Sequence, residues 1–108
     1  MNLVEIAGSA PGREGVVWTL EGSEDLNANL VRFEAGRGVG EHVNDEVDVL
    51  IVGVSGSGFV GVDGEEHPVS SGDMVFVPRG ARRYTRAMSD DFAYLSAHRR
   101  RGPLRIGG

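Results

Sequence analysis

The sequence predicts one all-β domain that closes as a barrel or jelly roll. Its 108 residues suffice for one hydrophobic core and require no second domain. The 17 Gly residues and the short apolar runs between turn residues favour many short strands. Apolar residues at helical spacing are rare, so long helices are not expected. A meander with this rhythm of strands closes on itself.

Strands are predicted in seven places, each a short apolar or alternating run bounded by turn residues. Asp63-Gly64 is the clearest turn, because Gly accepts the positive φ angle that a tight hairpin requires. Pro78 lacks a backbone N–H and therefore ends the strand before it. In chain order the predicted strands are Val16–Leu20, Asn29–Glu34, Val49–Val54, Phe59–Val62, Met74–Val77, Arg82–Arg86 and Phe92–His98.

The two ends of the chain differ from the middle. Residues 1–15 alternate poorly and contain four Gly or Pro residues, so we expect an N-terminal arm or an edge strand around Leu3–Ile6. Residues 16–100 form the predicted barrel. Residues 101–108 include Gly102-Pro103 and a terminal Gly pair, which predict a loosely held tail.

The composition excludes several classes of function. The chain has no Cys, which rules out disulfides, thiolate metal sites and thiol nucleophiles. It shows neither a signal-like start nor an apolar run long enough to span a membrane, so we expect a cytoplasmic protein that does not bind membranes. Eight of the 11 Arg residues follow Pro78, but the net charge is −5 and we expect no binding to nucleic acid.

A first motif begins at Gly36. Five residues separate Gly36 from His42, and Asn44 and Asp48 follow at short spacing. Imidazole, amide and carboxylate groups in one segment are typical of a polar site, and His and Asp are common metal ligands.

A second motif begins at Gly72. Five residues separate Gly72 from Pro78, Gly80 follows, and Arg83 comes after two more residues. Together the two motifs resemble the signature motifs of the cupin family, and the likeness runs from about residue 30 to residue 98. The resemblance implies a single-domain, RmlC-like β-barrel whose first motif supplies two His and one Glu to a divalent metal, and whose second motif supplies one His.

The resemblance implies a metal site that lacks most of its ligands. His42 stands at the first ligand position. Asn44 replaces the second His, and an amide oxygen is a poor ligand for Zn, Cu or Ni. Asp48 stands near the Glu position, but the run to Gly56 is one residue longer than usual, so Glu46, Asp48 or Val49 is the inward residue. Arg83 replaces the last His, and a guanidinium has no lone pair for a cation.

We therefore expect no tightly bound metal. Weak binding of a divalent ion is the most that these residues would allow. A planar guanidinium can instead hold a carboxylate or phosphate with two hydrogen bonds. A site of His42, Asn44, Asp48 and Arg83 would bind a small anionic molecule, and the substrate is not assigned. The structural alternative is that Arg83 pairs with Asp48 or Glu46 and fills the space itself.

Two enzyme hypotheses stay open at this point. The first is a metal-dependent enzyme of dioxygenase or isomerase type, with His42, Glu46 and Asp48 as ligands. The second is metal-free acid–base catalysis, in which His42 paired with Asp48 takes a proton and Tyr94 gives one. Small cupins commonly form two-fold dimers, so the resemblance also implies a homodimer, with Trp18 as a packing or interface residue.

Overall fold

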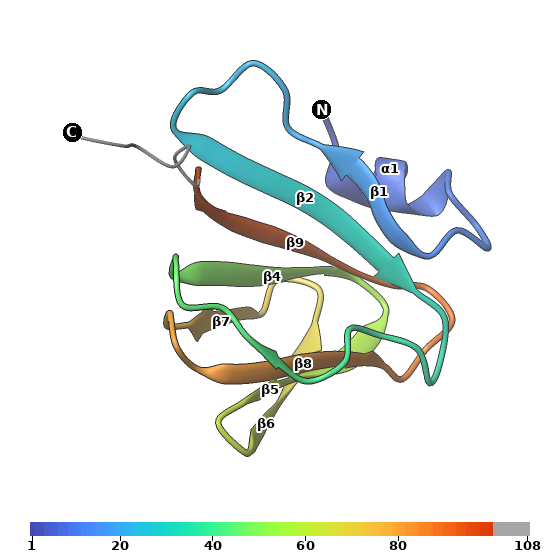
Figure 1. Ribbon diagram of the computed structural model, residues 1–108. Helices are drawn as coiled ribbons and strands as arrows, with labels where there is room; N and C mark the ends of the chain where they lie inside the picture. Colours follow the sequence, from blue (N-terminus) through green and yellow to red (C-terminus); the bar gives the residue numbers. More distant parts are fainter. Residues whose placement is uncertain (101–108) are drawn as a thin grey trace.

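The computed structural model describes residues 1–100 and confirms the all-β prediction. Two antiparallel sheets face each other, with strand orders β1-β2-β9-β4-β7 and β3-β8-β5-β6 (Figure 1). The elements are α1 (Leu3–Gly8), β1 (Gly15–Thr19), β2 (Leu26–Phe33), β3 (His42–Val43), β4 (Val49–Ser55), β5 (Ser57–Val62), β6 (Glu65–Ser70), β7 (Met74–Val77), β8 (Arg82–Ala87) and β9 (Phe92–Arg99).

All seven predicted strands are present, with ends shifted by a few residues, and two strands are additional. The short strand β3 follows a Gly-rich segment that gave no strand signal. The strand β6 is polar and contains Pro68, which argues against a central strand. It lies at the edge of its sheet, where a missing N–H is tolerated. The Asp63-Gly64 turn has positive φ at both residues, as predicted.

The edge strand predicted around Leu3–Ile6 is wrong, because this segment is the helix α1. Asn2 caps it: the backbone N–H of Glu5 donates to the Asn2 side chain over 3.1 Å. Leu3, Ile6 and Ala7 lie on one helical face and pack on the outer face of the five-stranded sheet. This six-residue helix is too short for its periodicity to stand out in the sequence. Among residues 1–100, no helix has the length and apolar composition needed to cross a membrane.

The core lies between the two sheets. Inward and outward residues alternate at the start of β4, where the inward Val49 and Ile51 are 1% and 3% exposed. Phe92 of β9 and Val60 of β5 are completely buried and bring the two sheets together. The predicted tail at residues 101–108 lies outside the described residues.

The segment before β3 is held against β8 by backbone hydrogen bonds. The N–H of Gly36 donates to the carbonyl of Ala87, and the N–H of Thr85 donates to the carbonyl of Val39. Gly38 makes the approach possible, since a Cβ atom there would lie 1.9 Å from the carbonyl oxygen of Thr85. The segment therefore runs flat along β8 and delivers β3 to its partner strand.

We expect Gly38→Ala to destabilise the protein by about 1–3 kcal/mol, because the added methyl group overlaps backbone atoms that cannot swing away. Gly40→Ala is the matched control: a Cβ there meets no atom within 4 Å, so its effect should stay within about 0.5 kcal/mol. Urea unfolding measures both free energies. Equal stability of the two variants would contradict the close packing of this segment.

The outer face of the five-stranded sheet carries an apolar patch that α1 does not cover. It consists of Leu26, Leu50, Met74 and Phe76, which are 57%, 41%, 63% and 54% exposed. The register aligns Leu50 with Phe76 on the neighbouring strand β7. Trp18, in contrast, is half-buried and packs beside α1.

The homodimer stays a prediction, and this apolar patch is where we expect it to form. Its four side chains expose roughly 400 Å², close to the apolar share of the ~800 Å² that each partner buries in a standard interface. Asp48 and Arg99 line the groove beside the patch, so a second copy can offer an opposite charge to each.

Light scattering after gel filtration should give a dimer for the full chain and a monomer for a variant that combines Leu50→Asp with Phe76→Asp. Met88→Asp, at an exposed residue outside the patch, should remain dimeric. A monomeric parent at high concentration, or a dimeric double variant, would rule out this interface.

Candidate functional site

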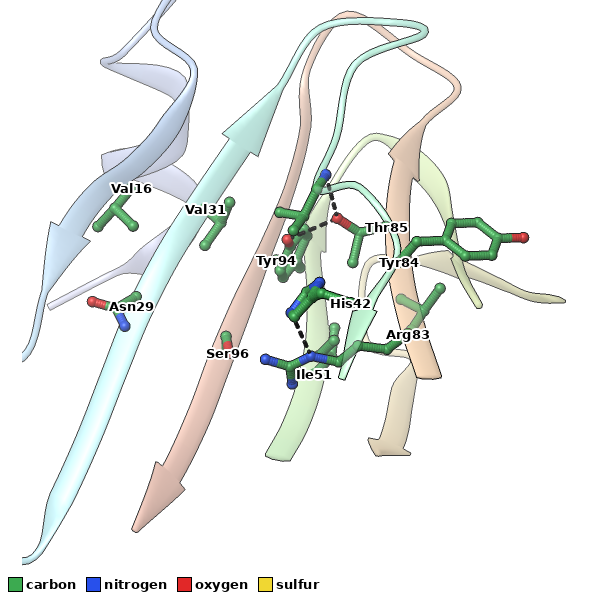
Figure 2. A pocket seen from close by; sticks show the side chains of 12 residues that line it. Val16, Asn29, Val31, His42, Ile51, Arg83, Tyr84, Thr85, Tyr94 and Ser96 are labelled. Carbon is green, nitrogen blue, oxygen red and sulfur yellow. Dashed lines mark hydrogen bonds between the residues drawn. The ribbon is translucent and has the colours of Figure 1, made fainter. Parts of the chain in front are cut away.

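The two sheets enclose a cavity of about 150 Å³. Its walls are apolar where Val31, Ile51 and Val60 face one another. Polar side chains interrupt these walls from both sheets (Figure 2). They are Asn29, His42, Arg83, Thr85, Tyr94 and Ser96.

His42 and Arg83 are cross-strand neighbours on β3 and β8. The Nε–H of Arg83 donates to Nε2 of His42 over 3.0 Å (Figure 2). On its other side the His42 ring contacts the carbonyl oxygen of Gly40 through Nδ1, at 2.8 Å. A carbonyl only accepts and Nε–H only donates, so the partners require a neutral imidazole with its proton on Nδ1.

Asn44 lies beside this pair. A depression of about 420 Å³ shares His42 and Arg83 with the cavity and is also lined by Asn44 and Glu46. The N–H of Glu46 donates to Oδ1 of Asn44 over 2.9 Å, which fixes the orientation of the amide. Nδ2 of Asn44 is buried, and no acceptor for it exists within residues 1–100. Asn44 thus has a buried amide donor without a partner among residues 1–100, next to the depression that the residue lines.

Asp48 is the predicted site residue that the structure places elsewhere. Its Oδ1 accepts from the backbone N–H of Arg79 over 2.8 Å, and it lines the outer groove beside the apolar patch. Val49 belongs to the core, and Glu46 lines the depression beside Arg83. The structure therefore brings His42, Asn44, Glu46 and Arg83 together and leaves Asp48 out.

These residues do not fit a divalent metal. The lone pair of His42 that could ligate one accepts from Arg83, and the amide oxygen of Asn44 accepts from Glu46. Across residues 1–100, no three His, Asp or Glu side chains are grouped so that they could hold an ion. His42, Glu46 and Asp48 in particular do not share one site.

Two of the residues that line the cavity form a buried pair of hydroxyl groups. Tyr94 and Thr85 are 3.0 Å apart, and the N–H of Val39 donates to the Thr85 oxygen over 3.2 Å. Burial raises the pKa of Tyr94 above its ordinary value, although the hydrogen bond with Thr85 opposes this. Tyr94 is therefore a neutral phenol at physiological pH. Its ring lines the cavity, whereas Tyr84 points away from it (Figure 2).

Residues 29–97, more than half of the chain, match the family model described as Cupin domain. The chain belongs to the cupin family. No curated protein matches the sequence.

Solved structures agree with this cupin fold. KdgF from Halomonas sp. is 24% identical with a TM-score of 0.73, over 79% of this chain and 77% of its own. An RmlC-like cupin from Desulfovibrio desulfuricans is 24% identical with a TM-score of 0.66, over 75% and 77%. A predicted oxalate decarboxylase from Thermotoga maritima is 19% identical with a TM-score of 0.64, over 68% and 64%. At these identities the likeness concerns the fold.

Three polar residues that line the cavity of this cupin, Asn29, Thr85 and Ser96, are not predicted as site residues from the sequence. Asn29 and Ser96 fall in predicted strands and were counted only as strand residues. Alternation was the available signal: Asn29 shares its face with the buried Val31, and Ser96 shares its face with Tyr94. A polar side chain at an inward position next to buried apolar ones marks a cavity wall.

Restoring a His at the second-motif position should create metal affinity in this cupin. We expect Arg83→His to bind Zn²⁺ about tenfold more tightly than the parent, because a second imidazole replaces the cation and frees the lone pair of His42. Elemental analysis of protein purified without a His tag measures the uptake. Arg82→His is the control, since Arg82 faces outward and pairs with Glu41. Equal zinc in all three proteins would mean that residue 83 is not at the ligand position.

Proposed function

We propose that this cupin binds a small carboxylate in its cavity, with Arg83 as the group that holds the anion. The hydrogen bond from Arg83 to His42 supports this most directly. It fixes a guanidinium where the second motif of metal-binding cupins has its metal-binding His. The fold alone does not assign a reaction, so the proposal concerns binding.

The charge of the cavity favours an anion. Among the residues of the described range 1–100 that line the cavity, Arg83 carries the one permanent formal charge, because none of the others is Asp, Glu, Lys or Arg. A cation in a partly enclosed, low-dielectric space attracts a carboxylate more strongly than it would in water. Arg also matches the planar carboxylate with two parallel N–H donors.

Asn44 adds a second contribution. An unsatisfied buried donor costs about 1–3 kcal/mol, and Nδ2 of Asn44 is such a donor within the described part of the chain. A ligand oxygen at the entrance, beside Arg83, would recover this energy. A metal ion would not, since Nδ2 has no lone pair to donate.

The size of the cavity limits the ligand. A cavity of about 150 Å³ corresponds to a molecule the size of benzene, or about six non-hydrogen atoms. Short aliphatic carboxylates fit this limit.

Glu46 is the internal competitor for the guanidinium. It lines the same depression as Arg83, so the structural alternative, in which Arg83 serves only to neutralise a carboxylate of the chain, concerns Glu46 and not Asp48. The two roles have opposite consequences for Glu46→Gln. If the site takes up ligand carboxylates, removing this negative charge should tighten their binding.

NMR titration with acetate, propionate and pyruvate, in a buffer without carboxylates, tests the proposal. We expect saturable shifts of amides around residues 42–46 and 83. Arg83→Gln should weaken binding about 10- to 100-fold, as expected for loss of a charged hydrogen-bonding partner. Glu46→Gln should strengthen it.

Arg82→Gln is the matched control on the same strand and should bind like the parent, because its side chain points out of the barrel toward Glu41. Absence of saturable shifts with every carboxylate, or unchanged affinity in Arg83→Gln, would refute carboxylate binding at this position.

A further inference from the structure

The cavity wall formed by β2 and β9, which faces the sheet that carries Arg83, contains a polar pair. Asn29 of β2 and Ser96 of β9 are register partners, so their side chains stand next to each other on the inward face. Both residues are half-buried. The next pair along the same strands, Val31 and Tyr94, is buried and belongs to the core. Asn29 and Ser96 thus mark a local change from apolar to polar wall.

Both residues of this pair line the cavity and have hydrogen-bonding capacity left. The hydroxyl of Thr19 donates to Oδ1 of Asn29 over 2.8 Å, which leaves Nδ2 of Asn29 as a donor. The hydroxyl of Ser96 makes no hydrogen bond to any other side chain or backbone group of residues 1–100. A serine hydroxyl both donates and accepts. The wall therefore presents two adjacent neutral groups.

The charged group comes from the facing sheet. Arg83 extends from β8 toward β9, and its guanidinium ends on the side of the cavity where Ser96 stands (Figure 2). A ligand in the cavity can thus contact a cation supplied by β8 together with a neutral amide and hydroxyl supplied by β2 and β9. A polar group on an enclosed sheet face lowers the stability of the folded protein unless it forms a hydrogen bond. The neighbouring inward positions are apolar, so this pair is an exception on its sheet face.

We infer that the ligand is a short hydroxycarboxylate, which places its carboxylate at Arg83 and its hydroxyl at Asn29 and Ser96. This inference rests on the proposed function. A hydroxyl accepts from Nδ2 of Asn29 and exchanges a second hydrogen bond with Ser96, so it satisfies both neutral groups.

Other small carboxylates fit this wall less well. A second carboxylate would lose its hydration at Asn29 and Ser96 without meeting a cation there. The ammonium group of an amino acid would need a carboxylate, and within residues 1–100 no Asp or Glu lines the cavity. A plain fatty acid would leave both neutral groups without partners, which is how a site rejects an analogue that lacks a hydroxyl.

Matched pairs of ligands test the inference: lactate against propionate, and 3-hydroxybutyrate against butyrate, with malonate as the dicarboxylate. In the parent protein at least one hydroxy acid should bind about three- to tenfold more tightly than its partner, and malonate should bind more weakly than that hydroxy acid. A variant with Asn29→Leu and Ser96→Ala should bind the members of each pair equally.

Two further variants keep the result interpretable. Arg83→Gln should weaken both members of a pair by the same factor, whereas Ser71→Ala, an exposed serine in the turn before β7, should leave the preference unchanged. The dispersion of the NMR spectrum reports whether each variant is folded.

The outcomes separate the two proposals. Equal affinity for both members of each pair, with Arg83-dependent binding intact, would overturn the hydroxycarboxylate assignment alone. If the preference survives in the Asn29→Leu, Ser96→Ala variant, the assignment to this wall is also wrong. Failure of every carboxylate to bind would overturn the proposed function itself.

Discussion

The contact between Arg83 and His42 determines what this cavity can hold. It uses the one imidazole lone pair available at the first-motif position and puts a permanent positive charge beside it. Both effects act in the same direction, because a cation loses a ligand and gains a repelling neighbour. Both ring nitrogens of His42 have a partner, the carbonyl oxygen of Gly40 at Nδ1 and the Nε–H of Arg83 at Nε2.

This contact depends on backbone geometry elsewhere. β3 has two residues and would not hold its register alone. Its register is set by the preceding segment, which is tied to Thr85 and Ala87 and fits against β8 only because residue 38 lacks a side chain. The site therefore forms at the edge of the four-stranded sheet. There β8 supplies Arg83 and also aligns the segment that carries His42.

The sequence predicted the fold well because inward and outward residues alternate along most strands, as at Ile51 and Phe92. The sequence did not predict α1 or β6, because the local signals there are weak. The helix α1 spans less than two turns, and Pro68 argues against a strand at β6. The site was predicted in part. His42 and Arg83 are one cross-strand pair, whereas the placement of Asp48 depended on how an extra residue before Gly56 is accommodated. Only the folded chain settles that register.

The backbone holds the barrel together, whereas side chains on the cavity wall would contact a ligand. This difference affects how easily the ligand preference of the cavity could change during evolution. Asn29 and Ser96 join their strands through main-chain hydrogen bonds, which do not depend on side-chain identity. Exchanging either side chain alters the cavity wall and leaves the ladder in place. The barrel can therefore come to bind a different ligand at little cost in stability. A position such as Gly38, where one added carbon would collide with the backbone of Thr85, does not have this freedom.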